Sequence, residues 1–157
     1  MSAATEALCN HPVFRFFRVI SDIPRPSKHE EQISQFLFRW ARERGLEAEQ
    51  DEKLNILIRK PATPGYEGAP GIMLQAHMDM VCEKAPEAEH DFMKDPIHWE
   101  LDGDILSTGR RTTLGADDGI GVAMASDICG FNLNEVCTAT MHFLEDPDCD
   151  LLEYMPM

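Results

Sequence analysis

The stretch Gly71-Ile72-Met73-Leu74-Gln75-Ala76 is a short, mostly apolar run that follows Pro70 and leads directly into His77. Apolar side chains at consecutive positions are typical of a strand that is buried on both faces, as in a parallel sheet. Because helical patterns lie on both sides of this run, we expect an α/β fold with helices packed on a mostly parallel, twisted sheet. His77 would then lie at the carboxyl end of a buried strand, where open α/β sheets place their ligand-binding crevice.

Two helices are predicted before this strand. The first covers residues 11–20, with Asn10 as a candidate N-cap. The second follows Ser27, since Ser27-Lys28-His29-Glu30 matches the capping box, and Gly45 lies where a left-handed C-terminal cap belongs. Each helix carries an apolar stripe at helical spacing, and Phe16, Phe17, Phe36 and Trp40 are expected to form a core between the helices and the sheet.

The other elements are predicted from shorter patterns. Apolar residues alternate from Leu54 to Ile58, which predicts a half-buried strand. Residues 81–109 are polar and irregular, with a short hairpin expected around Asp102-Gly103. A helix is expected from Asp118 or Gly119 to about Ile128, and a further strand from Val136 to Leu144.

The composition excludes several classes of protein. The chain has 157 residues and a formal net charge of −14, a length that suits one domain or one domain with a fragment of another. Such an acidic surface argues against nucleic acid as a partner, and no apolar run approaches the roughly 18 residues of a membrane helix. The five cysteines include no C-x-x-C pair, and the start is not a secretory signal, so we expect reduced thiols in a cytoplasmic protein.

The residues with the clearest chemistry are His77-Met78-Asp79 and Gly115-Ala116-Asp117-Asp118-Gly119. Imidazole and carboxylate are natural ligands of catalytic zinc where thiolates are absent. In an extended segment His77 and Asp79 project to the same face, so that Asp79 can orient the imidazole. The glycines around Asp117 allow the backbone to bend so that this carboxylate can reach the ion.

Each motif also has a plainer interpretation. A single His-x-Asp is common in structural roles, and an aspartate before a helix caps it. A third interpretation is a magnesium–phosphate binding module built on Asp117 and Asp118, with Gly115, Gly119 and Gly121 cradling the phosphate. The glycine spacing matches neither common phosphate-loop pattern, which makes this the weakest of the three.

Residues from about 10 to about 126 resemble the amino-terminal part of the aminoacyl-histidine (Xaa-His) dipeptidases of the M20 metallopeptidase family. The stretches that carry the resemblance are Ile23–Glu31, Gln75–Val81, His90–Phe92, Lys94–Ile97 and Thr112–Gly121.

The resemblance implies hydrolysis of dipeptides, of Xaa-His type or more broadly, at a two-zinc site by metal-activated water. His77 would bind one Zn²⁺ ion, Asp117 would bridge both ions, and Asp79 would hold the His77 ring. The partner is then a small peptide substrate, and full-length relatives can form homodimers.

The family also has two adjacent acidic residues, a general base and a metal ligand, some thirty positions after the bridging aspartate. In one alignment Leu144–Asp148 ends a helix and the chain stops before that pair, which the Glu-Asp-Pro sequence favours. In the other, the strand Val136–Leu144 supplies Glu145 as the base and Asp146 as the ligand.

In both alignments residues 1–157 correspond to the amino-terminal part of a catalytic domain, without its later ligands or the lid and dimerisation domain. We therefore expect an incomplete site. The chain on its own would bind metal weakly and be inactive.

Overall fold

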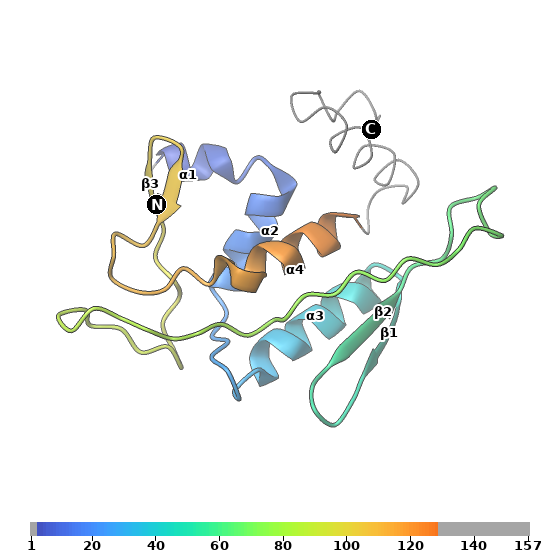
Figure 1. Cartoon of the computed structure of the whole chain (residues 1–157), viewed down its shortest axis with the longest axis horizontal. Helices are drawn as coiled ribbons and strands as arrows, with labels where there is room; N and C mark the ends of the chain where they lie inside the picture. The colour runs from blue at the N-terminus through green and yellow to red at the C-terminus, as the bar shows by residue number, and fades with distance from the viewer. Residues whose placement is uncertain (1–2, 129–157) are drawn as a thin grey trace.

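The computed structural model describes residues 3–128, which form four helices and two short antiparallel hairpins (Figure 1). The elements in chain order are α1 (Ala3–Leu8), α2 (Pro12–Ser21), α3 (Glu31–Glu43), β1 (Glu47–Gln50), β2 (Ile56–Arg59), β3 (Glu100–Asp102), β4 (Ile105–Ser107) and α4 (Ala116–Ile128). The predicted strand Val136–Leu144, and with it Glu145 and Asp146, lies outside the described residues. No helix within 3–128 is long and apolar enough to cross a bilayer.

The two predicted amino-terminal helices are confirmed as α2 and α3, but their caps differ from the prediction. His11, not Asn10, is the N-cap of α2, and neither helix has a side-chain hydrogen bond at its N-cap. The capping box does not form, because Lys28 has a φ of 71° and α3 begins only at Glu31. The Ser27 hydroxyl donates to Asp79, and Glu30 accepts a hydrogen bond from the Lys28 backbone N–H at 2.6 Å.

The end of α3 follows the sequence prediction. Gly45 has a φ of 73°, the left-handed conformation expected after a helix. The Gly45 N–H donates to Arg42 O at 3.0 Å and the Leu46 N–H donates to Ala41 O at 3.1 Å, which is the Schellman pattern. The chain then turns back along α3 and enters β1.

The core is centred on the apolar sides of α2 and α3. Phe17 and Trp40 are buried as predicted, whereas Phe16 and Phe36 are only partly buried and pack at its edge. The Phe16 ring lies 5.3 Å from the Trp40 ring in an edge-on arrangement. The buried cluster around α2 and α4 consists of Phe17, Ile20, Ile33, Leu37, Met80, Ile97, Trp99, Val122 and Ala123.

The β1–β2 hairpin follows its predicted pattern only in part, whereas the β3–β4 hairpin forms where it is predicted. The strand predicted from Leu54 begins at Ile56, because Leu54 has a φ of 68° and lies in the turn between β1 and β2. Arg59 on β2 forms ion pairs with Glu47 and Glu49 on β1. The hairpin predicted around Asp102-Gly103 is confirmed as β3 and β4.

The predicted parallel sheet is not found among the described residues. Residues 71–76 form no strand, and Ile72, Met73 and Leu74 are 51%, 85% and 50% exposed. The one isolated parallel bridge in the described part of the chain joins Pro26 to Met80. A strand needs hydrogen-bonding neighbours along its edges, and residues 3–128 place none beside this run. In Figure 1 the green segment that contains it runs extended across the view.

The helix predicted from residue 118 or 119 is confirmed as α4, which packs against α2. Asp117 and Asp118 have non-helical backbone angles, with ψ values of 108° and 37°, so the regular helix begins after them. The turn that carries Asp117 is thereby fixed at the amino-terminal end of a packed helix.

Candidate functional site

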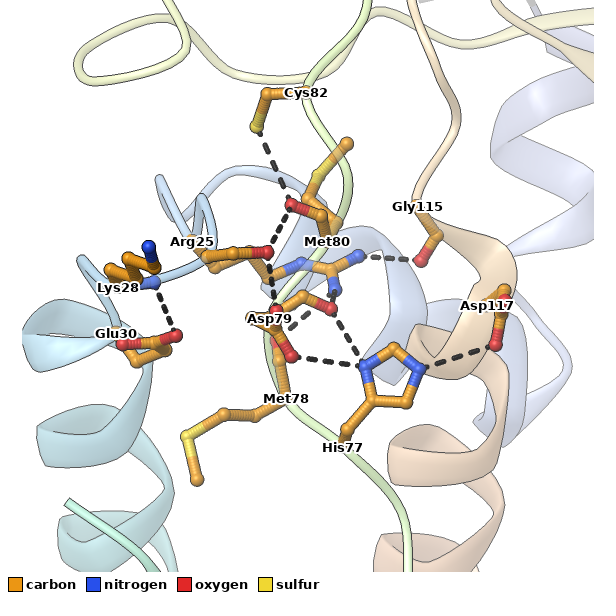
Figure 2. Close-up of polar contacts among 11 residues, drawn as sticks. Arg25, Lys28, Glu30, His77, Met78, Asp79, Met80, Cys82, Gly115 and Asp117 are labelled. Atoms are coloured by element: carbon orange, nitrogen blue, oxygen red, sulfur yellow. Dashed lines mark hydrogen bonds and ion pairs between the residues drawn. The ribbon is translucent and has the colours of Figure 1, made fainter. Parts of the chain in front are cut away.

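The structure brings together His77 and Asp117, which are 40 residues apart in sequence. His77 ends the extended stretch described above, and Asp117 lies in the turn that leads into α4. Their closest atoms, His77 Nε2 and Asp117 Oδ1, are 3.2 Å apart (Figure 2). The imidazole and the carboxylate therefore point toward one another, as the sequence motifs suggest for two ligands of one site.

Asp79 contacts the other side of the same imidazole. His77 Nδ1 lies 3.1 Å from Asp79 Oδ1 and 3.2 Å from the Asp79 backbone oxygen. The second carboxylate oxygen of Asp79 accepts a hydrogen bond from the Ser27 hydroxyl at 2.5 Å. Asp79 is thus fixed by Ser27 and in turn fixes the orientation of the His77 ring.

The two carboxylates change the acid–base behaviour of the imidazole. Partial burial lowers the pKa of His77, but hydrogen bonds with Asp117 and Asp79 outweigh this, and the pKa is raised above its ordinary value. Both ring nitrogens can donate only when the imidazole is protonated, so two neighbouring carboxylates favour the imidazolium. The pKa of Asp79 is lowered, first by the hydrogen bond from Ser27 and then by His77, against an opposing effect of burial.

The chemistry of these groups fits part of a metal site. With Nδ1–H donating to Asp79, the His77 Nε2 lone pair is available to a cation, as in many histidine ligands. The side chains of His77 and Asp117 are 48% and 99% exposed, so both are open to solvent. Residues 3–128 nevertheless contain no group of three or more His, Cys, Asp or Glu side chains arranged to hold a metal ion. Glu145 and Asp146 are not among them.

Two residues of the site were not predicted from the sequence. The sequence pattern predicts Ser27 as a helix cap, and Arg25 is included only in the stretch Ile23–Glu31 that carries the family resemblance. The Arg25 side chain is buried, with 1% of the residue exposed, and its guanidinium donates to backbone oxygens of Met78, Asp79 and Gly115. Burial lowers the pKa of Arg25 to about 10, although the nearby Asp79 carboxylate raises it. The sequence signal that could have identified Arg25 is its position as a charged residue between two prolines, ahead of the His77-Met78-Asp79 motif.

Known proteins that resemble this chain indicate which function the arrangement of His77, Asp79 and Asp117 could serve. No family model matches the chain. The cytosol non-specific dipeptidase of Escherichia coli (strain K12) is 49% identical over 118 residues, which are 75% of this chain and 24% of the relative. The crystal structure of aminoacylhistidine dipeptidase from Vibrio alginolyticus matches with a TM-score of 0.70 and 46% identity, over 74% of this chain and 24% of that one.

The chain thus spans about a quarter of the length of these relatives. Over that part of the relatives, this chain matches both in sequence and in structure. The predicted resemblance is confirmed: about three quarters of this chain is similar in sequence and fold to part of the aminoacyl-histidine dipeptidases.

Proposed function

We propose that this chain contributes to the hydrolysis of dipeptides at a zinc site that includes His77 and Asp117. The observation that carries the proposal is the arrangement of His77 between Asp79 and Asp117, with Nε2 facing a solvent-exposed carboxylate. It occurs in a chain that is 49% identical to a dipeptidase over 118 residues. Residues 3–128 would form the first part of the catalytic domain.

The roles proposed for the residues are supported by the contacts that they make. His77 Nε2 and an Asp117 carboxylate oxygen would hold zinc, and Asp79 would keep the imidazole oriented with Nδ1 protonated. Bound zinc would lower the pKa of a water molecule to about 7 and polarise the carbonyl of the scissile peptide bond. A full two-zinc site needs further ligands and a base, for which Asp146 and Glu145 stay candidates under one of the two alignments.

The substrate class is proposed from the names of the relatives. One is called non-specific and the other is named for aminoacyl-histidine substrates, so we propose dipeptides, either Xaa-His or a broader set. A cytoplasmic location accords with the relative named as a cytosol enzyme. A homodimer is proposed for the full-length protein by resemblance alone.

A second candidate is a metal-binding chain without activity of its own. The described residues bring together two donors, whereas a catalytic zinc commonly has three protein ligands. Calorimetric titration of the 157-residue chain with zinc tests this directly. We expect weak binding that is lost in His77→Ala and kept in His98→Ala, an exposed histidine that serves as the matched control. Tight binding that survives His77→Ala would contradict the site.

Activity separates the two candidates. We expect no hydrolysis of a Xaa-His dipeptide above background by the 157-residue chain, even with excess zinc. Loss of a general base by itself costs on the order of 10²–10⁴ in rate. Joining the chain to the carboxyl-terminal three quarters of a relative should restore hydrolysis. Chelator-sensitive hydrolysis by the chain alone would point to Glu145 as the base, and Glu145→Gln should then abolish it. Binding of a nucleotide with magnesium, but not of zinc, would favour the phosphate module.

A further inference from the structure

We propose that Arg25 is a positioning residue that sets the spacing between the two segments of the candidate site. Its guanidinium would hold the segment that carries His77 and Asp79 against the turn that carries Asp117. The proposal rests on the proposed function in one respect, namely that the His77–Asp117 pair is a metal site. The placement of the two segments by Arg25 is a separate claim and is tested separately below.

The first support is the set of hydrogen bonds that Arg25 makes. Nη1 donates to Met78 O at 3.2 Å and lies 3.4 Å from Asp79 O, while Nη2 donates to Gly115 O at 2.7 Å. One nitrogen therefore serves the segment after His77, and the other serves the turn two residues before Asp117. Figure 2 shows the guanidinium between Asp79 and Gly115, beside the His77–Asp117 pair.

The second support is the space that the glycines leave for the guanidinium. A Cβ atom at Gly115 would lie 2.6 Å from Arg25 Nη2, and a Cβ atom at Gly119 would lie 2.7 Å from the same nitrogen. Both distances are far shorter than van der Waals contact. The two glycines that flank Asp117 therefore make room for Arg25, a role beyond the backbone flexibility that their sequence pattern suggested.

The third support is that the backbone of Arg25 contacts the same segment as its side chain. The Met80 N–H donates to Arg25 O at 3.0 Å, and Pro26 and Met80 form a parallel bridge. Met80 is 2% exposed and belongs to the main core cluster. Arg25 is thus anchored to the core through Met80, so its side chain reaches Gly115 from a fixed base.

The chemistry of Arg25 argues against a role in stability alone. A buried cation is costly, and no carboxylate within residues 3–128 lies at hydrogen-bonding distance from Arg25; its buried Nε has no hydrogen-bond partner among these residues. An apolar side chain would fill a core position at lower cost. Only a planar guanidinium offers donors in two directions at a fixed separation, which a lysine ammonium cannot reproduce.

The test compares Arg25→Lys and Arg25→Gln with Arg18→Lys in the metal-free 157-residue chain. Arg18 is the matched control, because it also donates to a backbone oxygen, Ile97 O at 3.1 Å, but bridges no part of the site. The readout is the pair of ring ¹⁵N chemical shifts of His77 at one fixed pH. Asp117→Ala supplies the shift expected when His77 Nε2 loses its partner.

We expect both Arg25 variants to move the His77 Nε2 shift toward the Asp117→Ala value, and Arg18→Lys to leave it unchanged. Backbone amide shifts of the β1–β2 hairpin report whether each variant is folded. If Arg25→Gln does not fold, Arg25→Lys, which keeps the charge and most of the volume, carries the test. Wild-type His77 shifts in a folded Arg25 variant would overturn the proposal.

Zinc titration of the same variants supplies the second readout. We expect Arg25→Lys to weaken zinc binding at least tenfold relative to Arg18→Lys, and equal affinities would count against the proposal. If the wild-type chain binds no zinc, the proposed function fails. The His77 ring shifts still decide whether Arg25 positions the pair, so the two failures are distinguishable.

Discussion

The apolar stripe of α3 and the apolar stretch at residues 72–74 have similar side chains but opposite environments. Ile33 and Leu37 on α3 are 0% and 7% exposed, whereas Met73 and Leu74 are 85% and 50% exposed. A helix satisfies its own backbone hydrogen bonds and needs a neighbour only along one face. An extended run needs hydrogen-bonding neighbours along its edges as well. An apolar run therefore indicates burial only where the fold supplies the partners that its backbone requires.

The largest effect expected in the packed region comes from Trp40→Ala. Trp40 contacts the Phe16 ring, and the Arg44 guanidinium lies 4.4 Å from the centre of its ring. Truncating a buried aromatic side chain typically costs about 3–5 kcal/mol. Urea unfolding followed by circular dichroism should show a free energy of unfolding that is lower by this amount, and with it a lower midpoint. An unchanged midpoint would mean that the α3 stripe contributes no more than the exposed stretch.

The sharpest form of the comparison applies one substitution to both regions. Leu37→Ala in the stripe should lower the free energy of unfolding by about 2–5 kcal/mol. Leu74→Ala in the exposed stretch should change it by about 0.5 kcal/mol or less, as is usual for surface positions. Both variants are measured by the same urea titration. Equal losses would show that residues 72–74 are covered in solution.

A smaller difference is expected between two glycines. Gly45 has a φ of 73° after α3, and a side chain in this conformation costs roughly 1–2 kcal/mol. Gly71, at the start of the exposed stretch, does not have a positive φ, and a Cβ there would meet nothing within 4 Å. Thermal unfolding should therefore show a lower midpoint for Gly45→Ala and no decrease for Gly71→Ala. A decrease for both would indicate that the stretch is constrained.

The smallest effect concerns the histidine that ends the exposed stretch. Because hydrogen bonds with Asp117 and Asp79 outweigh the opposing effect of burial, the folded-state pKa of His77 lies above 6.5. This group then adds stability that is fully present below pH 6.5 and is lost as the pH rises through the folded-state pKa. An NMR titration of the metal-free chain should give a raised midpoint for His77 and a lower one in Asp117→Asn. Identical midpoints would remove the Asp117 contact.

Features that depend on nearby residues could be predicted from the sequence. The apolar stripes correctly predicted α2 and α3, and Gly45 correctly predicted the end of α3, because these signals act within a few residues. The parallel sheet is not seen within residues 3–128, and the apolar pattern of residues 71–76 does not reveal whether a neighbouring strand is present. The partners of Arg25 and Ser27 were also missed. They lie 90 and 52 positions away, at Gly115 and Asp79, and no local pattern encodes such contacts.

The capping box failed for a related reason. Ser27 and Glu30 match the pattern, but the Ser27 hydroxyl donates to Asp79 instead of capping α3. As a cap, the Ser27 oxygen would accept from backbone N–H groups of the first helical turn, but Lys28 has a φ of 71° and α3 begins only at Glu31. The motif His77-Met78-Asp79, by contrast, suggested the observed contact between its two outer residues, because in an extended segment both side chains project to one face.

The exposed connection between β2 and His77 has a consequence for the covalent integrity of the molecule. Proteases cleave accessible, unpaired chain most readily, so within residues 3–128 limited digestion should first cut near Met73, which is 85% exposed. The amino-terminal fragment would keep Arg25, and the carboxyl-terminal fragment would keep both His77 and Asp117. Since α4 packs on α2 and Met80 bonds to the Arg25 backbone, the two pieces should stay together as complementing fragments. The candidate site would then be assembled from two separate polypeptides.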